Sequence, residues 1–254
     1  MDNLVYHYTT MEALAGIVSK NKITIWATRY NYLNDIYEKV WSQKHIKSII
    51  DKDLKGTNHS PEIINDLIDR HPYIISFCDI PDYRNMWRLY CNDGLGVCIG
   101  LNTEMLSQIA EVNRLTETAS KQDYFEHVRY CTLEQVPESI RFWKNTGLFN
   151  LNQNEAIDNL YAMSAFIKCD EFDIENEVRY SRMRENKSVK IIPSSNNKGF
   201  IHESEENFDN VKYRIRNQKE IVPYIEIDFP SQIIEKIIVG YGYDDMEMAK
   251  HYVR

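Results

Sequence analysis

Apolar residues along the chain follow two periodicities, one typical of strands and one typical of helices. Alternation and short apolar runs predict strands at 4–8, 22–26, 72–78, 95–101, 126–130, 174–182, 188–193, 222–229 and 234–240. Apolar spacings of three and four predict helices at 10–20, 34–50, 61–70, 103–112, 133–168 with a break near Gly147, and 245–253. The polar stretch 194–210 is expected to be a loop.

The first predicted strand places a histidine between two tyrosines, in the stretch "LVYHYTT". The pleat of this strand assigns its side chains to two faces, Leu4, Tyr6 and Tyr8 on one and Val5, His7 and Thr9 on the other. The following "TTME" fits a capping box, with Thr9 as the N-cap and Glu12 at the third helical position.

Strands at both ends and helices between them indicate an α+β fold, not a repeating βαβ unit. We expect one α+β domain over residues 1–254, with a central mixed or antiparallel sheet. With 254 residues, 43% of them hydrophobic, the chain is long enough to bury a real core.

Charge and cysteine content exclude several classes of protein. A net charge of −8 argues against a broad basic face for nucleic acid. The 5 cysteines are scattered without a C-x-x-C pair, which argues against a disulfide framework or a structural zinc site. Neither a signal peptide nor an apolar run of ~18 residues is present, so we expect a cytoplasmic protein without a membrane partner.

The stretch "FDIENEVRYSR" is the most informative for chemistry. As a strand it would place Glu175, Glu177 and Arg179 on one face, and Ile174, Asn176, Val178 and Tyr180 on the other. Two carboxylates beside a guanidinium suit a catalytic site, although a solvated strand face would show the same pattern.

A second candidate is the segment "SFCDIPDYRNMWRLYCNDGLGV", which places Ser76 inside an apolar strand. Tyr83, Trp87 and Tyr90 lie about one helical turn apart and favour either a stacking wall for a planar ligand or ordinary core packing. The Gly94-x-Gly96 pair lacks the third glycine of a dinucleotide fingerprint, and no Walker loop, His-Glu-x-x-His helix or G-x-S-x-G elbow occurs.

In order and spacing, the chain resembles an uncharacterised bacterial family of domains of unknown function. The matching pieces are "YHYT" at 6–9, "LND" at 33–35 with Glu38, "ISF" at 75–77, "MW" at 86–87 with Tyr90, "GVCIG" at 96–100, Phe172 with "ENEVR" at 175–179, and "IIVG" at 237–240. Two positions depart from the family pattern: Ile36 stands where a proline is usual, and Phe172 where a tryptophan is usual.

The same order of residues is distantly similar to ADP-ribosyltransferases, which implies an ADP-ribosyltransferase-like fold and NAD as substrate. The resemblance implies Glu177 and Glu175 as catalytic residues, Glu177 supporting the ribose and Glu175 contacting the acceptor. It implies a set of NAD-binding residues: His7, Tyr8, Thr9, Ser76, Tyr90 and Arg179. An acceptor protein, DNA or RNA, and an antitoxin or partner protein, would complete a toxin or phage-defence effector.

Two other functions remain open at this point. The first is a non-catalytic ligand-binding or interaction domain on the same scaffold. The second is a carboxylate-based hydrolase or nuclease that uses Glu175, Glu177 and Asp35 as acid, base or metal ligands. For the diphosphate of NAD, the arginine candidates are Arg29, Arg84 and Arg179.

Overall fold

The computed structural model describes residues 3–18, 21–34, 72–116, 122–145, 162–183, 190–193, 200–203 and 211–242. Its strands are β1 (Leu4–Thr10), β2 (Lys22–Arg29), β3 (Tyr73–Cys78), β4 (Gly96–Asn102), β5 (Asp123–His127), β6 (Arg129–Cys131), β7 (Ile167–Cys169), β8 (Glu177–Arg182), β9 (Lys190–Pro193), β10 (Phe200–Glu203), β11 (Lys212–Arg216), β12 (Glu220–Pro230) and β13 (Ile234–Val239). Its α-helices are α1 (Met11–Ile17), α4 (Arg84–Tyr90), α5 (Thr103–Thr116) and α6 (Val136–Asn145). Short 3-10 helices are η1 (Tyr30–Tyr32), η3 (Leu133–Gln135), η4 (Asp170–Glu175) and η5 (Ser231–Ile233).

A curled antiparallel sheet dominates the described part of the chain, as expected for an α+β fold. Within that part, the sheet has 9 strands in the order β11-β12-β2-β3-β1-β4-β13, with β8 on β3 and β5 on β8. The small pair β6 and β7 is parallel, and β9 pairs with β10. The predicted mixed or antiparallel central sheet is therefore purely antiparallel in its main part.

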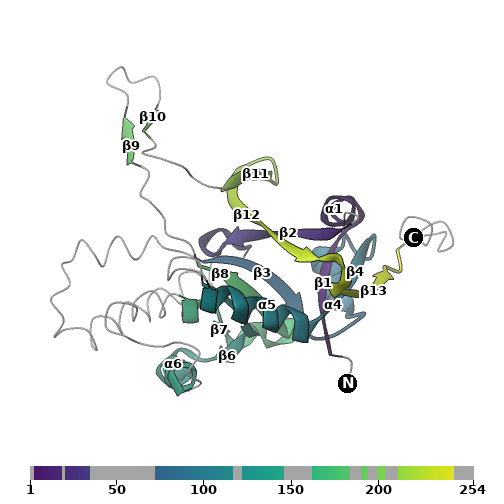
Figure 1. The fold of residues 1–254 in the computed structure, drawn as a ribbon, viewed down its shortest axis with the longest axis horizontal. Coiled ribbons are helices and arrows are strands. Elements are labelled where there is room, and N and C mark those ends of the chain that lie inside the picture. Colours follow the sequence, from purple (N-terminus) through teal and green to yellow (C-terminus); the bar gives the residue numbers. More distant parts are fainter. Residues whose placement is uncertain are drawn as a thin grey trace.

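The sheet forks along one edge of β3. The start of β3 pairs with β2 through Ile74 and Thr28, whereas its end pairs with β1 through Cys78 and Tyr6. The other edge pairs with β8 over the whole length of β3. In Figure 1, β1 and β2 run in clearly different directions away from β3. This divergence leaves the middle of β3, around Ser76, facing the gap between β1 and β2.

Two clusters of buried side chains lie on the two faces of the sheet. The larger combines alternate residues of β1, β2, β3, β8 and β12 with Leu14 of α1 and Leu106 of α5. The smaller joins Tyr6 and Tyr8 of β1 to Trp87 of α4 and to three cysteines, Cys78, Cys91 and Cys98. The predicted division of β1 into two faces is confirmed, because Val5 belongs to the first cluster and Tyr6 and Tyr8 to the second. The cysteines are free thiols.

Two local predictions are wrong. The N-cap of α1 is Thr10, whose side chain accepts from the backbone N–H of Ala13, and not Thr9. Thr9 pairs with Val97 and Thr10 with Gly96, so β1 continues through Thr10, which is also the N-cap. The strand predicted over 174–182 begins only at Glu177, because 170–175 form η4 and Asn176 adopts a left-handed conformation with φ 44°.

Other predictions are confirmed in part or fall outside the described residues. Residues 136–145 are helical as expected, but 167–169 form β7, and the stretch predicted as a loop contains β10. The predicted helices at 61–70 and 245–253, nearly all of the one at 34–50, and the break near Gly147 lie outside the described residues. In the described part, none of the helices is long and apolar enough to cross a bilayer.

Candidate active site

A cavity of about 410 Å³ opens where the sheet forks. Its walls come from β1, β2, β3 and α1, together with side chains from α4, β11 and the start of β8. This volume falls in the range typical of small-molecule sites, roughly 300–1,000 Å³. Most of the residues singled out from the sequence line this one cavity: His7, Tyr8, Thr9, Ser76, Tyr90, Glu175 and Glu177.

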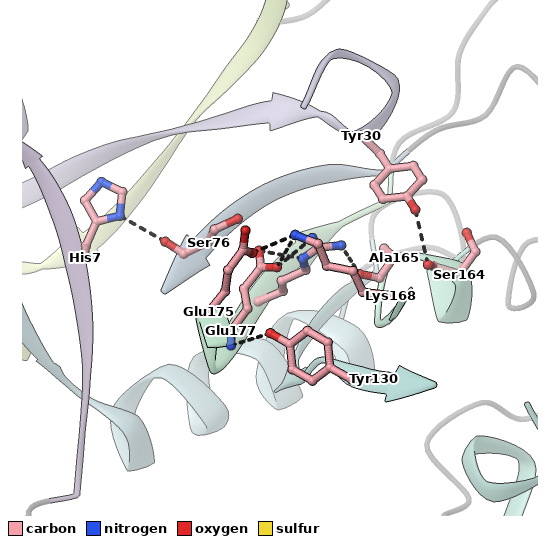
Figure 2. A network of polar contacts seen from close by, with 10 residues as sticks. His7, Tyr30, Ser76, Tyr130, Ser164, Ala165, Lys168, Glu175 and Glu177 are labelled. Atoms are coloured by element: carbon pink, nitrogen blue, oxygen red, sulfur yellow. Dashed lines mark hydrogen bonds and ion pairs between the residues drawn. The ribbon is translucent and has the colours of Figure 1, made fainter. Parts of the chain in front are cut away.

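Glu177 lies in a buried ion network at the base of the cavity. Arg179 donates from Nε to one carboxylate oxygen at 2.7 Å and from Nη2 to the other at 2.8 Å. Arg179 also donates to the Ala165 carbonyl, and the Glu177 backbone N–H donates to the Tyr130 hydroxyl at 2.8 Å. Figure 2 shows this network beside Ser76, with His7 on the far side of that residue. A bidentate arginine fixes the carboxylate in one orientation.

Lys168 of β7 bridges the two glutamates. Its Nζ lies 2.7 Å from Glu175 Oε2 and 3.5 Å from Glu177 Oε2. The Lys168 side chain is only 5% exposed and that of Glu175 15%. Glu175 therefore lies at the more open end of the network, and Glu177, at 7%, is enclosed.

The two glutamates have opposite pKa shifts. Burial alone would raise the pKa of Glu177, but Arg179, Lys168 and hydrogen bonds from Arg179 and Ser76 outweigh it and lower the pKa to about 2. Burial raises the pKa of Glu175, and the nearby Lys168 opposes that shift only in part. Glu177 is thus an anion at neutral pH, whereas Glu175 takes up a proton more readily.

The left-handed Asn176 explains how both glutamates reach the same lysine. Residues 170–175 form a 3-10 helix, and Asn176 then turns the chain into β8. The Asn176 carbonyl accepts from Asp79 N–H at 3.0 Å, which ties this turn to the end of β3. Asparagine tolerates positive φ better than most residues. The common side of the glutamates is therefore produced by this turn, and not by the strand alternation predicted for 174–182.

His7 meets the site through the backbone of β3. Its Nδ1 lies 3.1 Å from the Ser76 carbonyl oxygen, and its ring packs edge-on against Phe77 at 5.9 Å between centroids. Removal from water lowers the pKa of His7, and the hydrogen bond to Ser76 opposes this only in part. A carbonyl can only accept, so Nδ1 carries the proton and Nε2 of the neutral ring is an acceptor.

The pleat places His7 and Glu177 on opposite faces of the sheet, although both line the cavity. His7 shares its face with Val5 and Phe77, members of the larger core cluster. Ser76 pairs with Arg179, and Cys78 with Glu177, so these four side chains point to the other face. The cavity reaches both faces because β1 and β2 separate at this point.

Of the remaining aromatic residues predicted for the site, some stabilise the fold and one has an exposed ring that lines the cavity. The Tyr8 hydroxyl donates to the Ile80 carbonyl at 2.7 Å and accepts from Tyr83 N–H at 2.9 Å, so it anchors the segment before α4. Trp87 is 1% exposed and belongs to the core, as the packing alternative predicted. Tyr90 is 40% exposed and lines the cavity, and its pKa is raised to about 12 by loss of hydration and then by Glu175 and Glu177.

Arg179 is not among the described residues that line the cavity, and its side chain is only 1% exposed. The sequence analysis missed two basic residues that matter here, Lys168 and Arg214. Lys168 stands alone in the apolar run "SAFIKC", a signal for a paired buried charge. Arg214 sits in the alternating "KYRIR", where nothing marks it apart from its basic neighbours.

Part of the chain matches a known family of proteins. Residues 86–180 match a family described as "Protein of unknown function (DUF2971)". The predicted resemblance to a domain of unknown function is therefore confirmed over this segment. The segment contains Tyr90, Lys168, Glu175, Glu177 and Arg179, and it leaves out His7 and Ser76.

The other comparisons give no relative from which a function can be transferred. No curated protein and no solved structure matches the chain. Among the described residues, no group of three or more His, Cys, Asp or Glu residues is placed to hold a metal ion. Asp35, the third acid of the predicted hydrolase site, lies outside these residues.

Proposed function

We propose that the protein cleaves NAD at the bond between nicotinamide and ribose and transfers ADP-ribose to an acceptor. The observation that supports this best is Glu177, fixed by Arg179 and ionised at neutral pH, in a cavity shared with His7 and Ser76. Loss of nicotinamide leaves positive charge on the ribose, as glycoside cleavage does. A fixed carboxylate at that position stabilises the transition state without having to reorganise.

Each of the two glutamates has its own part in the proposed reaction. The C–N bond breaks with its electron pair going to the pyridine nitrogen, so nicotinamide leaves as a neutral molecule. Glu177 accepts a hydrogen bond from a ribose hydroxyl and stabilises the developing charge. The acceptor nucleophile then forms a bond to the same carbon and gives its proton to Glu175, whose raised pKa suits a base.

His7 and Tyr90 supply binding in this proposal. The Nε2 lone pair of His7 is free to accept a hydrogen bond from the second ribose, because Nδ1 already donates to Ser76. The partly exposed ring of Tyr90 lies close enough to the acidic pair for both carboxylates to raise its pKa. An aromatic face next to the reacting carbon offers stacking to nicotinamide.

A test combines nicotinamide release with transfer of labelled ADP-ribose from NAD to components of a cell lysate. We expect Glu177→Gln to lose both activities by about 100-fold or more. Glu175→Gln should keep nicotinamide release and lose transfer. Glu126→Gln is a matched control, because Glu126 lies opposite Arg179 on β5 and does not line the cavity. A wild-type protein that neither binds NAD nor releases nicotinamide overturns the proposal.

A non-catalytic ligand-binding module is the second candidate. It is favoured by the fact that both oxygens of Glu177 already accept from Arg179, which is how a purely structural ion pair would look. In that case NAD, or a nucleotide like it, would bind without turnover, and Glu177→Gln would change only stability.

A further inference from the structure

Arg214 is a cation in the cavity without a carboxylate partner among the described residues. Its Nη2 donates to the Thr28 hydroxyl at 2.9 Å, and its buried Nε has no hydrogen-bond partner. Burial lowers the pKa of Arg214, and the positive charge of Arg216 lowers it further. A buried guanidinium N–H without an acceptor costs free energy unless a ligand supplies one.

The other two basic side chains of β11 form ion pairs with glutamates, and Arg214 differs from them in this respect. Lys212 pairs with Glu226 at 2.7 Å, and Arg216 pairs with Glu220 at 2.6 Å. Figure 1 shows β11 at the end of the sheet, beyond β12. Of the three basic residues on this strand, Arg214 is the one that lines the cavity and the one without an ion pair to any residue that the structure describes.

The sheet directs Arg214 to the same face as the acidic pair. Thr28, which Arg214 contacts, lies opposite Ile74 of β3, two residues before Ser76. Side chains two residues apart on a strand share a face, so Thr28, Ile74 and Ser76 point the same way. Ser76 in turn shares its face with Glu177. The cavity thus has a cation on its β2 side and an anion at its base.

Aromatic rings hold the guanidinium group in place. Its central carbon lies 5.7 Å from the centre of the Trp26 ring and 6.0 Å from that of Tyr224. The two rings stack on each other with centroids 4.4 Å apart. A guanidinium group held by aromatic rings loses little further entropy when it binds an anion.

We propose that Arg214 and Thr28 form a phosphate-binding subsite that takes the diphosphate of a dinucleotide. The identity of that dinucleotide as NAD rests on the proposed function; the subsite itself rests on the contacts of Arg214. A planar guanidinium group carries Nε–H and a neighbouring N–H side by side, the arrangement that binds two phosphate oxygens. The Thr28 hydroxyl accepts a hydrogen bond from Nη2, which orients the group, and Thr28 itself also lines the cavity.

The test measures binding of NAD, ADP-ribose, inorganic pyrophosphate and nicotinamide riboside by calorimetry. We expect Arg214→Gln to weaken NAD and ADP-ribose about 10- to 100-fold, the effect of losing hydrogen bonds to a charged group. Nicotinamide riboside, which has no phosphate, should bind Arg214→Gln as it binds the wild type. Arg216→Gln is the matched control for charge on the same strand and should bind all probes normally.

The fold of the variant provides an independent check. Since Arg214 has no ion pair among the described residues, Arg214→Gln should lose only the Thr28 hydrogen bond and the ring contacts, and should unfold within a few degrees of the wild type. A variant that is destabilised and still binds ADP-ribose as tightly as the wild type would show a structural role and overturn the subsite.

The outcomes separate this inference from the proposed function. Arg214-dependent binding of ADP-ribose and pyrophosphate without nicotinamide release would keep the subsite and overturn the transferase. Cleavage of NAD with an unchanged KM in Arg214→Gln would keep the transferase and overturn the subsite. A wild type that binds none of the three phosphate-bearing probes overturns the subsite as well.

Discussion

Glu177 keeps its charge because its partners are as buried as it is. Arg179 is 1% exposed and Lys168 5%, so water does not screen their attraction for the carboxylate. Removing one member of such a group lowers stability more than replacing the whole group with apolar residues, since it leaves the remaining charges buried and unpaired. The network can therefore serve stability and catalysis together, and substitutions have to be chosen to separate the two.

The lowered pKa of Glu177 predicts a dependence of stability on pH. Its pKa falls from 4.5 to about 2 in the folded state, so its stabilising effect is complete above pH 4.5 and is lost as the pH falls toward 2. We expect a loss on the order of 3 kcal/mol over that window. Urea unfolding between pH 7 and pH 2.5 measures it.

The matched control for this measurement is another glutamate, Glu111. Glu111→Gln, at an exposed position of α5, should leave the acid-induced loss unchanged. Glu177→Gln should have a lower free energy of unfolding at pH 7 and should lose less of it on acidification. An equal acid response in wild type and Glu177→Gln would contradict the assignment of the lowered pKa to this residue.

Helix α1 shows how one residue shifts the boundary between two elements. The "TT" pair offers two N-caps of equal chemistry, but β1 includes both threonines, pairing Thr9 with Val97 and Thr10 with Gly96, so the helix begins only after Thr10. Its capping bond runs from Ala13 N–H to the Thr10 hydroxyl at 3.2 Å. The choice affects the cavity, because it leaves Thr9 on the cavity wall next to His7.

This choice of cap can be tested by a pair of substitutions. Thr10→Ala should lower the free energy of unfolding by about 1 kcal/mol, the usual value of a lost N-cap. Thr9→Ala should change it by less than about 0.5 kcal/mol. Chemical denaturation of both variants compares them, and a larger loss for Thr9→Ala would favour the alternative cap.

At the scale of the whole molecule, tight backbone contacts fix the end of β1 against β4. Gly96 lies where β1, β4, α4 and β13 meet: it pairs with Thr10, and its carbonyl accepts from Gly240 N–H at 2.9 Å. A Cβ on Gly96 would collide with the Thr9 carbonyl and lie 2.8 Å from Cys91 Cβ. Only glycine fits this junction, which holds the His7 strand in position.

Gly96→Ala should therefore destabilise the protein by about 2 kcal/mol or more, since the obstructing atoms are mostly backbone. Gly16→Ala is the opposite case, because nothing lies within 4 Å of the added Cβ and the residue is inside α1. It should raise stability by about 0.5–1 kcal/mol. Thermal unfolding of the two variants gives the comparison, and equal effects would contradict the packing argument.

The sequence by itself determined most strands, the α+β class and most of the residues in the candidate site. These follow from local rules: the short apolar run of Tyr73–Cys78 favours a buried strand, and the mixed pattern of Leu4–Thr10 favours a partly buried one. Only the tertiary structure decided that β1 and β2 leave β3 at different points, because strand pairing joins segments far apart in the chain. The same pairing enclosed Arg179 behind Glu177 and brought Lys168 and Arg214 to the site, since the partners of a charge depend on register and not on sequence distance.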